Sequence, residues 1–404
     1  MTAIGAKSHL PPQLTLLQRL QLLTGILIAL PRLIFRITRD LLFNHDSASF
    51  STIWMRNTSR VADSLPHPQA RALQRPSGST IASLCKTYSL RHETIELDAG
   101  SAFPLATLHF IDCDPTARSP SGNVLLYFHG GGYITPLSTG HFKFARAAAQ
   151  RLTAKCVLLE YTLAPELKYP GQLAQAAAAL RYLLQHHDAA EVTIAGDSAG
   201  GNLALGVLAH LRDPHLLVRP VFEGDLRQQE QKLCAVLCVS PRCANTCDAE
   251  SYTYNASKDI VSRALMEVFN SHWEPVKEEV WATPLAGTKE FWGSVPAKKV
   301  LLLAGTDEVY VDDIRRFGEL LGSSSQAAST ELILCAEETH AQAIRDVAVN
   351  NWDGVMLKVA LNWLQNLGTL NDRGLPLPPN SKGVCAVWND TINVMTDSDT
   401  RHAR

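Results

Sequence analysis

A serine between two glycines occurs in the segment GDSAG at 196–200, directly after the apolar run Val192–Ala195. The residues from Gly201 begin a helix-like pattern. A strand, a glycine-flanked serine and a helix are typical of a nucleophile elbow, in which a sharp turn presents the serine hydroxyl and small neighbours avoid a clash. The N-terminus of the helix also favours the negative charge that develops in acyl transfer. The pattern predicts that Ser198 is a nucleophile.

A second glycine cluster, HGGG at 129–132, follows the apolar run Val124–Phe128. Three consecutive glycines disfavour both strand and helix, and their amides can approach a ligand unobstructed by side chains. We expect the amides of Gly131, Gly132 and Ala199 to form an oxyanion hole, where one donor is worth about 3–4 kcal/mol of transition-state stabilisation.

Three further residues adjoin these donors and the nucleophile. We interpret His129 as a hydrogen-bonding residue that fixes the glycine loop, rather than as a base. Tyr133 directly follows the loop and Asp197 directly precedes the nucleophile. We expect both to contact the substrate, and we expect Tyr133 to narrow the space for its acyl group.

The acid and the base of such a site are expected later in the chain, in the order Ser, Asp, His, at the ends of strands. A long apolar run ends in Asp307, and the next apolar run is followed by a loop that holds His340. Asp312 and Asp313 are alternatives for the acid, but they fall inside the next predicted helix. These positions predict a triad of Ser198, Asp307 and His340.

The region around these motifs alternates short apolar runs with longer helical patterns, which is typical of an α/β fold. The runs are predominantly apolar, as expected of strands buried on both faces. The alternation predicts a mainly parallel central sheet covered by helices on both faces, with a helical cap. Together with the nucleophile elbow, this arrangement resembles the α/β-hydrolase fold. The predicted strands are Val124–Phe128, Cys156–Glu160, Val192–Ala195, Cys234–Cys238, Val300–Leu303 and Glu331–Leu334.

Changes of pattern divide the chain into four parts. Residues 1–58 form an N-terminal segment with an amphipathic helix, and residues 59–89, rich in Pro, Ser and Arg, are a predicted linker. Residues 90–370 form the α/β domain, with a helical cap insertion near 250–282. Residues 371–404 are predicted to be a poorly ordered tail.

The N-terminal helix, within residues 14–39, has a narrow polar stripe that ends in Arg32, Arg36 and Arg39. One interpretation is a helix that lies on a membrane surface, with its arginines near anionic head groups. A second is a cap helix whose apolar side packs over the core. The third is a tilted transmembrane span, although the uncharged run that ends at Arg32 is too short to cross a bilayer unaided.

The overall composition excludes several classes of protein. The 404 residues are 46% hydrophobic and 19% charged, and the formal net charge of -2 offers no basic excess for nucleic acid. Cys234, Cys238, Cys243 and Cys247 have no histidine at zinc spacing, so we predict core cysteines and no metal. We expect neither a metal nor an organic cofactor, and a cytoplasmic location or one associated with the endoplasmic-reticulum membrane.

Taken together, HGGG at 129–132 and GDSAG at 196–200 resemble the hormone-sensitive-lipase family of α/β-hydrolase esterases. The segment 161–166 resembles that family's Y-R-L-A-P-E, with Thr162 in place of arginine, and Asp307 and His340 match its acid and base. The resemblance covers roughly residues 90–370. The apolar N-terminal helix and the long tail look more like the fungal steryl-acetyl-hydrolase branch of this family.

The resemblance implies an enzyme that removes a short acyl group, acetyl above all, from a lipophilic alcohol such as a sterol. Its partner would be a small-molecule ester, while the oligomeric state stays undetermined. A lyase or acyl transferase could use the same triad, because the acceptor depends on access of water. A ligand receptor on the same scaffold is a third possibility, but such receptors characteristically lose the histidine that is present here as His340.

Overall fold

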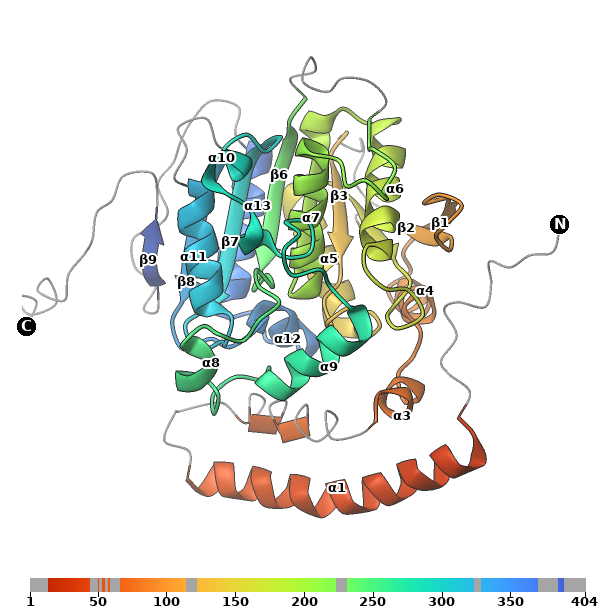
Figure 1. The fold of residues 1–404 in the computed structure, drawn as a ribbon, viewed down its shortest axis with the longest axis vertical. Helices are drawn as coiled ribbons and strands as arrows, with labels where there is room; N and C mark the ends of the chain where they lie inside the picture. Colours follow the sequence, from red (N-terminus) through yellow and green to blue (C-terminus); the bar gives the residue numbers. More distant parts are fainter. Residues whose placement is uncertain are drawn as a thin grey trace, which may run out of the picture.

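A nine-stranded sheet forms the centre of the molecule in a computed structural model of the chain (Figure 1). The structure describes residues 14–43, 50, 53–54, 57–58, 66–113, 122–222, 231–322, 328–369 and 384–388. The strand order is β1-β2-β4-β3-β5-β6-β7-β8-β9, and the six strands from β4 to β8 in this order run parallel. The strands are β1 (His92–Leu97), β2 (Ala106–Ile111), β3 (Val124–Phe128), β4 (Lys155–Glu160), β5 (Val192–Asp197), β6 (Leu233–Val239), β7 (Ala297–Gly305), β8 (Ser329–Cys335) and β9 (Val384–Trp388).

The six predicted strands are the six parallel ones, so the predicted fold class is confirmed. The predicted strands do not include β1, β2 and β9, which form the antiparallel pairs at the two ends of the sheet. Strand β1 is largely exposed, and its sequence HETIEL has few apolar residues. An edge strand of this kind lacks the continuous apolar run by which buried strands are recognised.

Helices cover both faces of the sheet and bury two separate apolar clusters. Successive residues of β5 show the alternation, because Ile194 lies in one cluster and Ala195 in the other. One face is covered by α6 (Gly171–Leu184), α7 (Ala199–Arg212) and α11 (Val311–Gly322), and the other by α4 (Ser77–Thr87), α5 (Thr139–Leu152), α12 (Gln342–Ala348) and α13 (Val355–Thr369).

The predicted linker at 59–89 is corrected by the structure, which forms two helices within it, α3 (His67–Ala72) and α4. The content of Pro, Ser and Arg in this stretch is typical of a loop. It is helical because of distant partners: the Gly78 amide donates to the Glu160 carboxylate at 2.7 Å, and Ile81 and Cys85 are buried against the core. Linker composition is thus overridden here by tertiary contacts.

The predicted cap insertion is helical in the structure, with α8 (Ser251–Tyr254) and α9 (Arg263–Trp273). Helix α9 crosses the end of the molecule where the parallel strands terminate (Figure 1). Of the C-terminal tail, only the strand at 384–388 belongs to the described residues, so the prediction of poor order lies mostly outside them.

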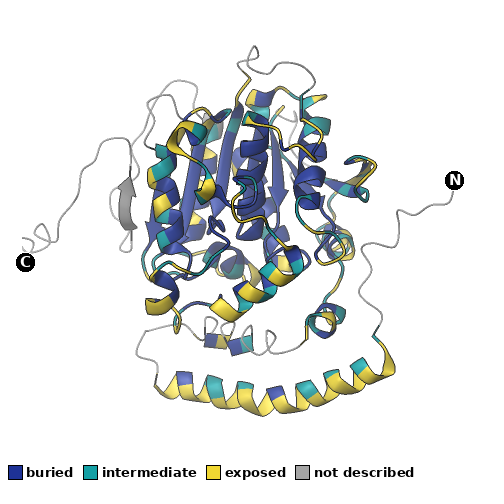
Figure 2. Cartoon of the chain, in the orientation of Figure 1, coloured by how far each residue is buried: buried dark blue, intermediate teal, exposed yellow. Residues whose placement is uncertain are grey.

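Helix α1 (Leu16–Leu42) lies apart from the sheet, along the side of the molecule that carries α3 and α9 (Figure 1). Its only buried residues are Ala29 and Asp40, and the side turned away from the body is exposed along its whole length (Figure 2). Most of its large apolar side chains lie on that exposed side, among them Leu16, Leu17, Leu20, Leu23, Leu27, Ile28, Leu30, Ile34 and Phe35. Of the three interpretations of this helix, the structure therefore contradicts the one in which its apolar side packs over the core.

Candidate active site

The nucleophile elbow forms as predicted between β5 and α7. Ser198 stands between the last residue of the strand and the first of the helix, with a φ of 51° and a ψ of -116°. The neighbouring backbone is so close that a Cβ on Gly200 would lie 2.0 Å from the Phe128 carbonyl oxygen, and one on Gly196 would lie 2.3 Å from that of Gly200. Both glycines are therefore sterically required, as the sequence predicted.

The predicted base meets the predicted nucleophile. The distance between His340 Nε2 and Ser198 Oγ is 2.8 Å, although the two residues lie far apart in the chain. Ser198 is 6% exposed and His340 is 4% exposed, so the contact is shielded from water. The ring of Tyr310 meets the imidazole edge-on at 4.7 Å and helps to fix its plane.

The predicted acid is corrected by the structure, which brings Glu308 rather than Asp307 to the histidine. Glu308 Oε2 lies 3.1 Å from His340 Nδ1, and the glutamate is 0% exposed. Asp307 instead points outward, where its carboxylate pairs with Lys258 Nζ at 2.9 Å. The two residues occupy consecutive positions of the turn after β7, and a turn directs neighbouring side chains to different sides.

Burial governs the electrostatics of this carboxylate. Burial raises the pKa of Glu308. The hydrogen bond and the charge interaction with His340 lower this pKa and so oppose the effect of burial. The anionic form of Glu308 therefore depends on its histidine partner. A carboxylate in this position fixes the tautomer of the ring, with the proton on Nδ1 and an acceptor nitrogen facing the serine.

Asp259 in the cap segment connects the loops of the acid and the base, and no sequence pattern indicates this role. Its Oδ1 accepts from the His340 amide at 3.0 Å, and its Oδ2 accepts from the Val309 amide at 2.8 Å. Asn255 adds a second connection by donating to the Glu308 carbonyl oxygen at 2.9 Å. The residue types alone, an aspartate and an asparagine in a polar stretch, carry no signal for such distant partners.

The glycine loop supplies two backbone donors beside the nucleophile, and the first residue of α7, Ala199, supplies a third. Gly131 and Gly132 have φ angles of 102° and 61°, which side chains rarely tolerate. Within the described part of the chain, the amides of Gly131, Gly132 and Ala199 donate to no protein acceptor. Gly132 and Ala199 are buried, and buried amides without a partner are rare in folded proteins. These three are free to bind an oxygen that carries negative charge.

Asp197 supports the glycine loop instead of facing a substrate. Its carboxylate accepts from the Gly130 amide at 3.0 Å and from the Tyr127 hydroxyl, and His141 Nε2 lies 3.3 Å away. Burial would raise the pKa of Asp197, but His141 and the hydrogen bond from Tyr127 lower it overall. The prediction of a substrate contact is therefore replaced by a structural role.

Tyr133 is likewise buried, and its hydroxyl donates to Asn202 Oδ1 at 2.7 Å. Its ring stacks on Trp273 of α9 at 4.0 Å, so it forms part of the wall under the cap. His129 behaves as expected for a loop-fixing residue: Nδ1 lies 2.8 Å from the Gly130 carbonyl oxygen, and burial lowers the pKa of the ring to about 3.

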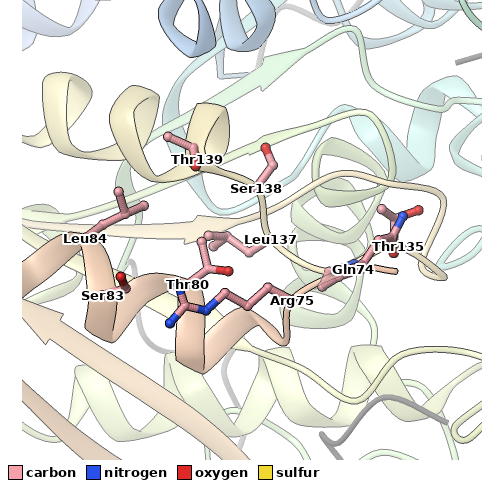
Figure 3. Close-up of a pocket in the computed structure, with 10 residues that line it drawn as sticks. Gln74, Arg75, Thr80, Ser83, Leu84, Thr135, Leu137, Ser138 and Thr139 are labelled. Atoms are coloured by element: carbon pink, nitrogen blue, oxygen red, sulfur yellow. The ribbon is translucent and has the colours of Figure 1, made fainter. Parts of the chain in front are cut away.

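A pocket of about 340 Å³ lies beside the continuation of the glycine loop. Figure 3 shows that its walls come from two facing segments, residues 74–84 and residues 135–139. A hydrogen bond from the Leu137 amide to Ser77 Oγ, 3.0 Å long, connects these segments. The pocket includes neither Ser198 nor His340, so it is separate from the chemistry of the site.

No group of metal-binding side chains occurs among the residues that the structure describes. The four cysteines that lie at metal-like spacing in the sequence are all free thiols: Cys234, Cys238, Cys243 and Cys247. Burial raises the pKa of the Cys238 and Cys243 thiols, which disfavours the thiolate form that a metal requires.

A sequence profile of the alpha/beta hydrolase fold matches residues 125–344, which is more than half of the chain. The chain belongs to the α/β-hydrolase family. The matched residues include the glycine loop, the elbow and His340. The predicted resemblance to α/β-hydrolase esterases is thereby confirmed at the level of the family and the fold.

Two relatives illustrate the similarity of this α/β-hydrolase to esterases. It is 30% identical over 200 residues to an acetyl-hydrolase of Streptomyces hygroscopicus, which covers 48% of this chain and 60% of the relative. It is 28% identical over 185 residues to versiconal hemiacetal acetate esterase of Aspergillus parasiticus, which covers 44% of this chain and 54% of the relative. The chain thus spans little more than half the length of these relatives.

The fold also matches solved structures. A thermostable esterase from Pseudomonas putida superposes with a TM-score of 0.62 at 18% identity, over 80% of this chain and 97% of that one. At this identity the likeness supports the fold alone.

Proposed function

We propose that this α/β-hydrolase is a serine carboxylic-ester hydrolase with Ser198 as nucleophile, His340 as base and Glu308 as acid. The observation that carries the proposal is the 2.8 Å contact between His340 Nε2 and Ser198 Oγ beside three unpartnered backbone amides. A receptor on this scaffold would need neither an activated serine nor free oxyanion donors. The names of the two relatives, an acetyl-hydrolase and an acetate esterase, agree with ester hydrolysis.

The reaction proceeds in two halves through a Ser198 acyl-enzyme. His340 Nε2 takes the serine proton as Oγ attacks the acyl carbon, and the amides of Gly131, Gly132 and Ala199 bind the oxyanion. His340 then returns the proton to the departing alcohol. Water enters, loses a proton to His340 and releases the acid. Throughout, Glu308 holds the Nδ1 proton and stabilises the imidazolium.

The acyl group of the substrate is short in this proposal, and acetyl fits best. Helix α9 closes over the glycine loop, since a Cβ on Gly132 would lie 2.2 Å from the Phe269 ring. The Tyr133 ring, stacked on Trp273, closes the neighbouring side. Little room is left beside the oxyanion donors, which disfavours long acyl chains. A lipophilic alcohol, such as a sterol or another natural product, is the proposed other half of the ester.

The test is hydrolysis of p-nitrophenyl esters by the purified chain, with acyl groups from two to about twelve carbons. We expect kcat/KM to be highest for the acetate-to-butyrate range and to fall for eight carbons or more. Mass spectrometry should detect an acyl adduct on Ser198. Equal or greater kcat/KM on long-chain esters would contradict the short acyl group, and absence of any turnover would contradict the esterase itself. Analysis of products in the presence of added alcohols distinguishes hydrolysis from acyl transfer.

We also propose that α1 lies on a membrane surface through its exposed apolar side. Helix α1 has 27 residues, and the mean hydropathy of its apolar stretch is 1.7. The helix is therefore long enough and apolar enough to enter a membrane. Each exposed Leu or Ile contributes about 1.5–3 kcal/mol on leaving water. The charged residues favour an anionic surface, because the helix carries four arginines and one aspartate, Asp40, which pairs with Arg39.

Contacts at two places along α1 favour a helix that lies in the plane of the membrane over one that spans it. Gln69 of α3 donates to Gln21 at 3.4 Å, and Asn57 donates to Asp40 at 2.9 Å. Both contacts lie on the side turned to the body, so the helix is held along the protein with its apolar side outward. A spanning helix would have to break them.

Sedimentation with anionic vesicles of phosphatidylcholine and phosphatidylserine tests this arrangement. Replacement of Leu23, Leu27 and Leu30 by serine should release the protein into the supernatant, while Leu216→Ser/Leu217→Ser, a matched change at exposed leucines of the body, should not. Alkaline carbonate should extract the bound wild type, whereas a spanning protein would resist. A wild type that never sediments contradicts membrane binding altogether.

A further inference from the structure

Arg242 is a buried arginine near the nucleophile, and the proposed chemistry does not employ it. It lies in the loop after β6, and its own amide donates to the Ser198 carbonyl oxygen at 3.2 Å. The residue is 1% exposed. Its side chain therefore begins beside the elbow and stays inside the protein.

The Arg242 guanidinium has few partners for a buried cation. One nitrogen, Nη2, donates to Asn270 Oδ1, and the group lies over the Trp273 ring at 5.3 Å. Nε and Nη1 are buried without a hydrogen-bond partner. Among the described residues, no carboxylate forms an ion pair with this guanidinium. A buried charge without a counter-ion is costly, and proteins rarely keep one unless something pairs with it.

The guanidinium is also close to the residues that surround the triad. Burial raises the pKa of the Tyr133 and Tyr310 hydroxyls, and in both the positive charge of Arg242 opposes the rise. Tyr310 contacts the imidazole of His340, and Tyr133 directly follows the glycine loop. The charge of this cation therefore reaches one residue beside the base and one residue beside the glycine loop.

We infer that Arg242 binds a carboxylate on the substrate, so that the proposed esterase takes short-chain esters whose alcohol part carries an acidic group. Nε belongs to one edge of the guanidinium and Nη1 belongs to the other, so either edge offers a free N–H to an anion. A carboxylate matches this fork geometry and supplies the missing counter-charge. That the substrate is an ester rests on the proposed function. That it carries a negative charge rests on the unpaired guanidinium of Arg242.

The surrounding rings define the rest of such a substrate. Trp273 and Tyr133 stack on each other next to the guanidinium, and both are buried. An anionic group attached to a flat or apolar body would meet charge and aromatic surface together. Asn270 and Trp273 belong to α9, so the bound anion would also fix the cap in its closed position.

The test compares acetoxybenzoates with the matching acetoxybenzamides, as ortho, meta and para isomers, because each pair differs in charge and hardly in shape. We expect the wild type to prefer the acid of at least one pair in kcat/KM. In Arg242→Met the ratio of acid to amide should fall about 10- to 100-fold, as expected for loss of a hydrogen-bonded ion pair. Arg242→Lys should keep part of the ratio. The exposed Arg91, replaced in Arg91→Met, serves as the control and should keep all of it.

A binding measurement separates this inference from the proposed function. Calorimetry on Ser198→Ala should give tighter binding of the preferred acid than of its amide, and Ser198→Ala/Arg242→Met should lose that difference. If no ester is hydrolysed but this difference is found, the esterase is wrong and the anion site stands. If esters are hydrolysed but the wild type prefers no acid, or Arg242→Met keeps the preference, the anion site is wrong. Should Arg242→Met fail to fold, the wild-type preference and Arg242→Lys decide.

Discussion

Ser198 and Glu308 lie on opposite sides of His340, and the chain holds them by different means. Ser198 is positioned by the residues next to it: a buried strand, a strained turn and the start of a helix. Glu308 is positioned by residues from another part of the chain, because Asn255 and Asp259 of the cap segment bind the backbone around it. The nucleophile side is built locally, whereas the acid side is completed by the cap.

This difference explains which mutations the nucleophile side and the acid side each tolerate. A local turn survives changes in distant parts of the fold, provided that its glycines remain. The acid loop depends on a segment that also covers the site, so a change in the cap can reach the acid without touching it. Mutations on the two sides should therefore separate the two cases, and their effect on turnover of a soluble acetate ester should decrease from the nucleophile to the support of the acid.

Removal of the nucleophile should have the largest effect. Ser198→Ala should lower kcat by up to about 10⁶-fold, because no other group can form the acyl-enzyme, and Ser198→Ala/His340→Ala should be little worse than either single variant. Steady-state kinetics on p-nitrophenyl acetate provide the measurement. A Ser198→Ala enzyme that keeps more than a tenth of wild-type turnover would show that the chemistry lies elsewhere.

The acid is tested by a matched pair of isosteric changes at consecutive positions. Glu308→Gln should lower kcat about 10⁴-fold, since the amide no longer stabilises the imidazolium and can hold the wrong tautomer. Asp307→Asn should change kcat less than about threefold, because it removes only a partly exposed ion pair with Lys258. The reverse ranking would restore Asp307 as the acid and would falsify the geometry of the turn.

The contact between the glycine loop and the cap is tested at Gly132. Gly132→Ala should lower kcat about 10²- to 10³-fold, the size expected when an oxyanion donor is displaced, because the new methyl group collides with Phe269. Phe269→Ala removes the obstacle, and the double variant should recover part of the loss. Recovery to near wild type would place the whole defect in the cap contact. No recovery would place it in the backbone strain at a φ of 61°.

The dependence of the acid side on the cap is tested at Asp259. Asp259→Ala removes the acceptor shared by the amides of His340 and Val309, and the resulting misplacement should lower kcat about 10- to 100-fold. Labelling of Ser198 by an organophosphate should slow as well, because the histidine shifts, while KM for p-nitrophenyl acetate should change much less. A variant that lowers only the thermal stability would make Asp259 a purely structural residue.

The same contrast governs how much of the molecule could be predicted from the sequence. The parallel strands, Ser198, His340 and the glycine loop were predictable, since each has a local pattern that physical chemistry requires. Glu308 was not, because the choice between two consecutive acidic residues depends on the direction of a turn and on Lys258 in the cap. The fold class followed from periodicity, while the side chains that support the site followed from tertiary contacts.

Two other differences between prediction and structure also arise from tertiary contacts. Helix α4 began with residues typical of a loop, and its distant partner Glu160 could not be read from the local sequence. The amphipathic pattern of α1 was correctly recognised, but periodicity alone does not say which side of a helix meets the protein. In the structure, the small residues Gly25 and Ala29 lie on the side that faces the body, and most of the leucines face outward.

The shared carboxylate of Asp259 has a consequence for engineering. Caps are obvious places to change substrate range, since they cover the site without belonging to the sheet. In this chain, however, an exchange of the whole segment between β6 and β7 would also exchange part of the support of the acid and the base. A grafted cap would have to keep Asn255 and Asp259 in the same positions relative to the loops of the acid and the base. Helix α9 is then the stretch that is open to redesign. The boundary between scaffold and specificity element therefore runs through the cap, before Arg263.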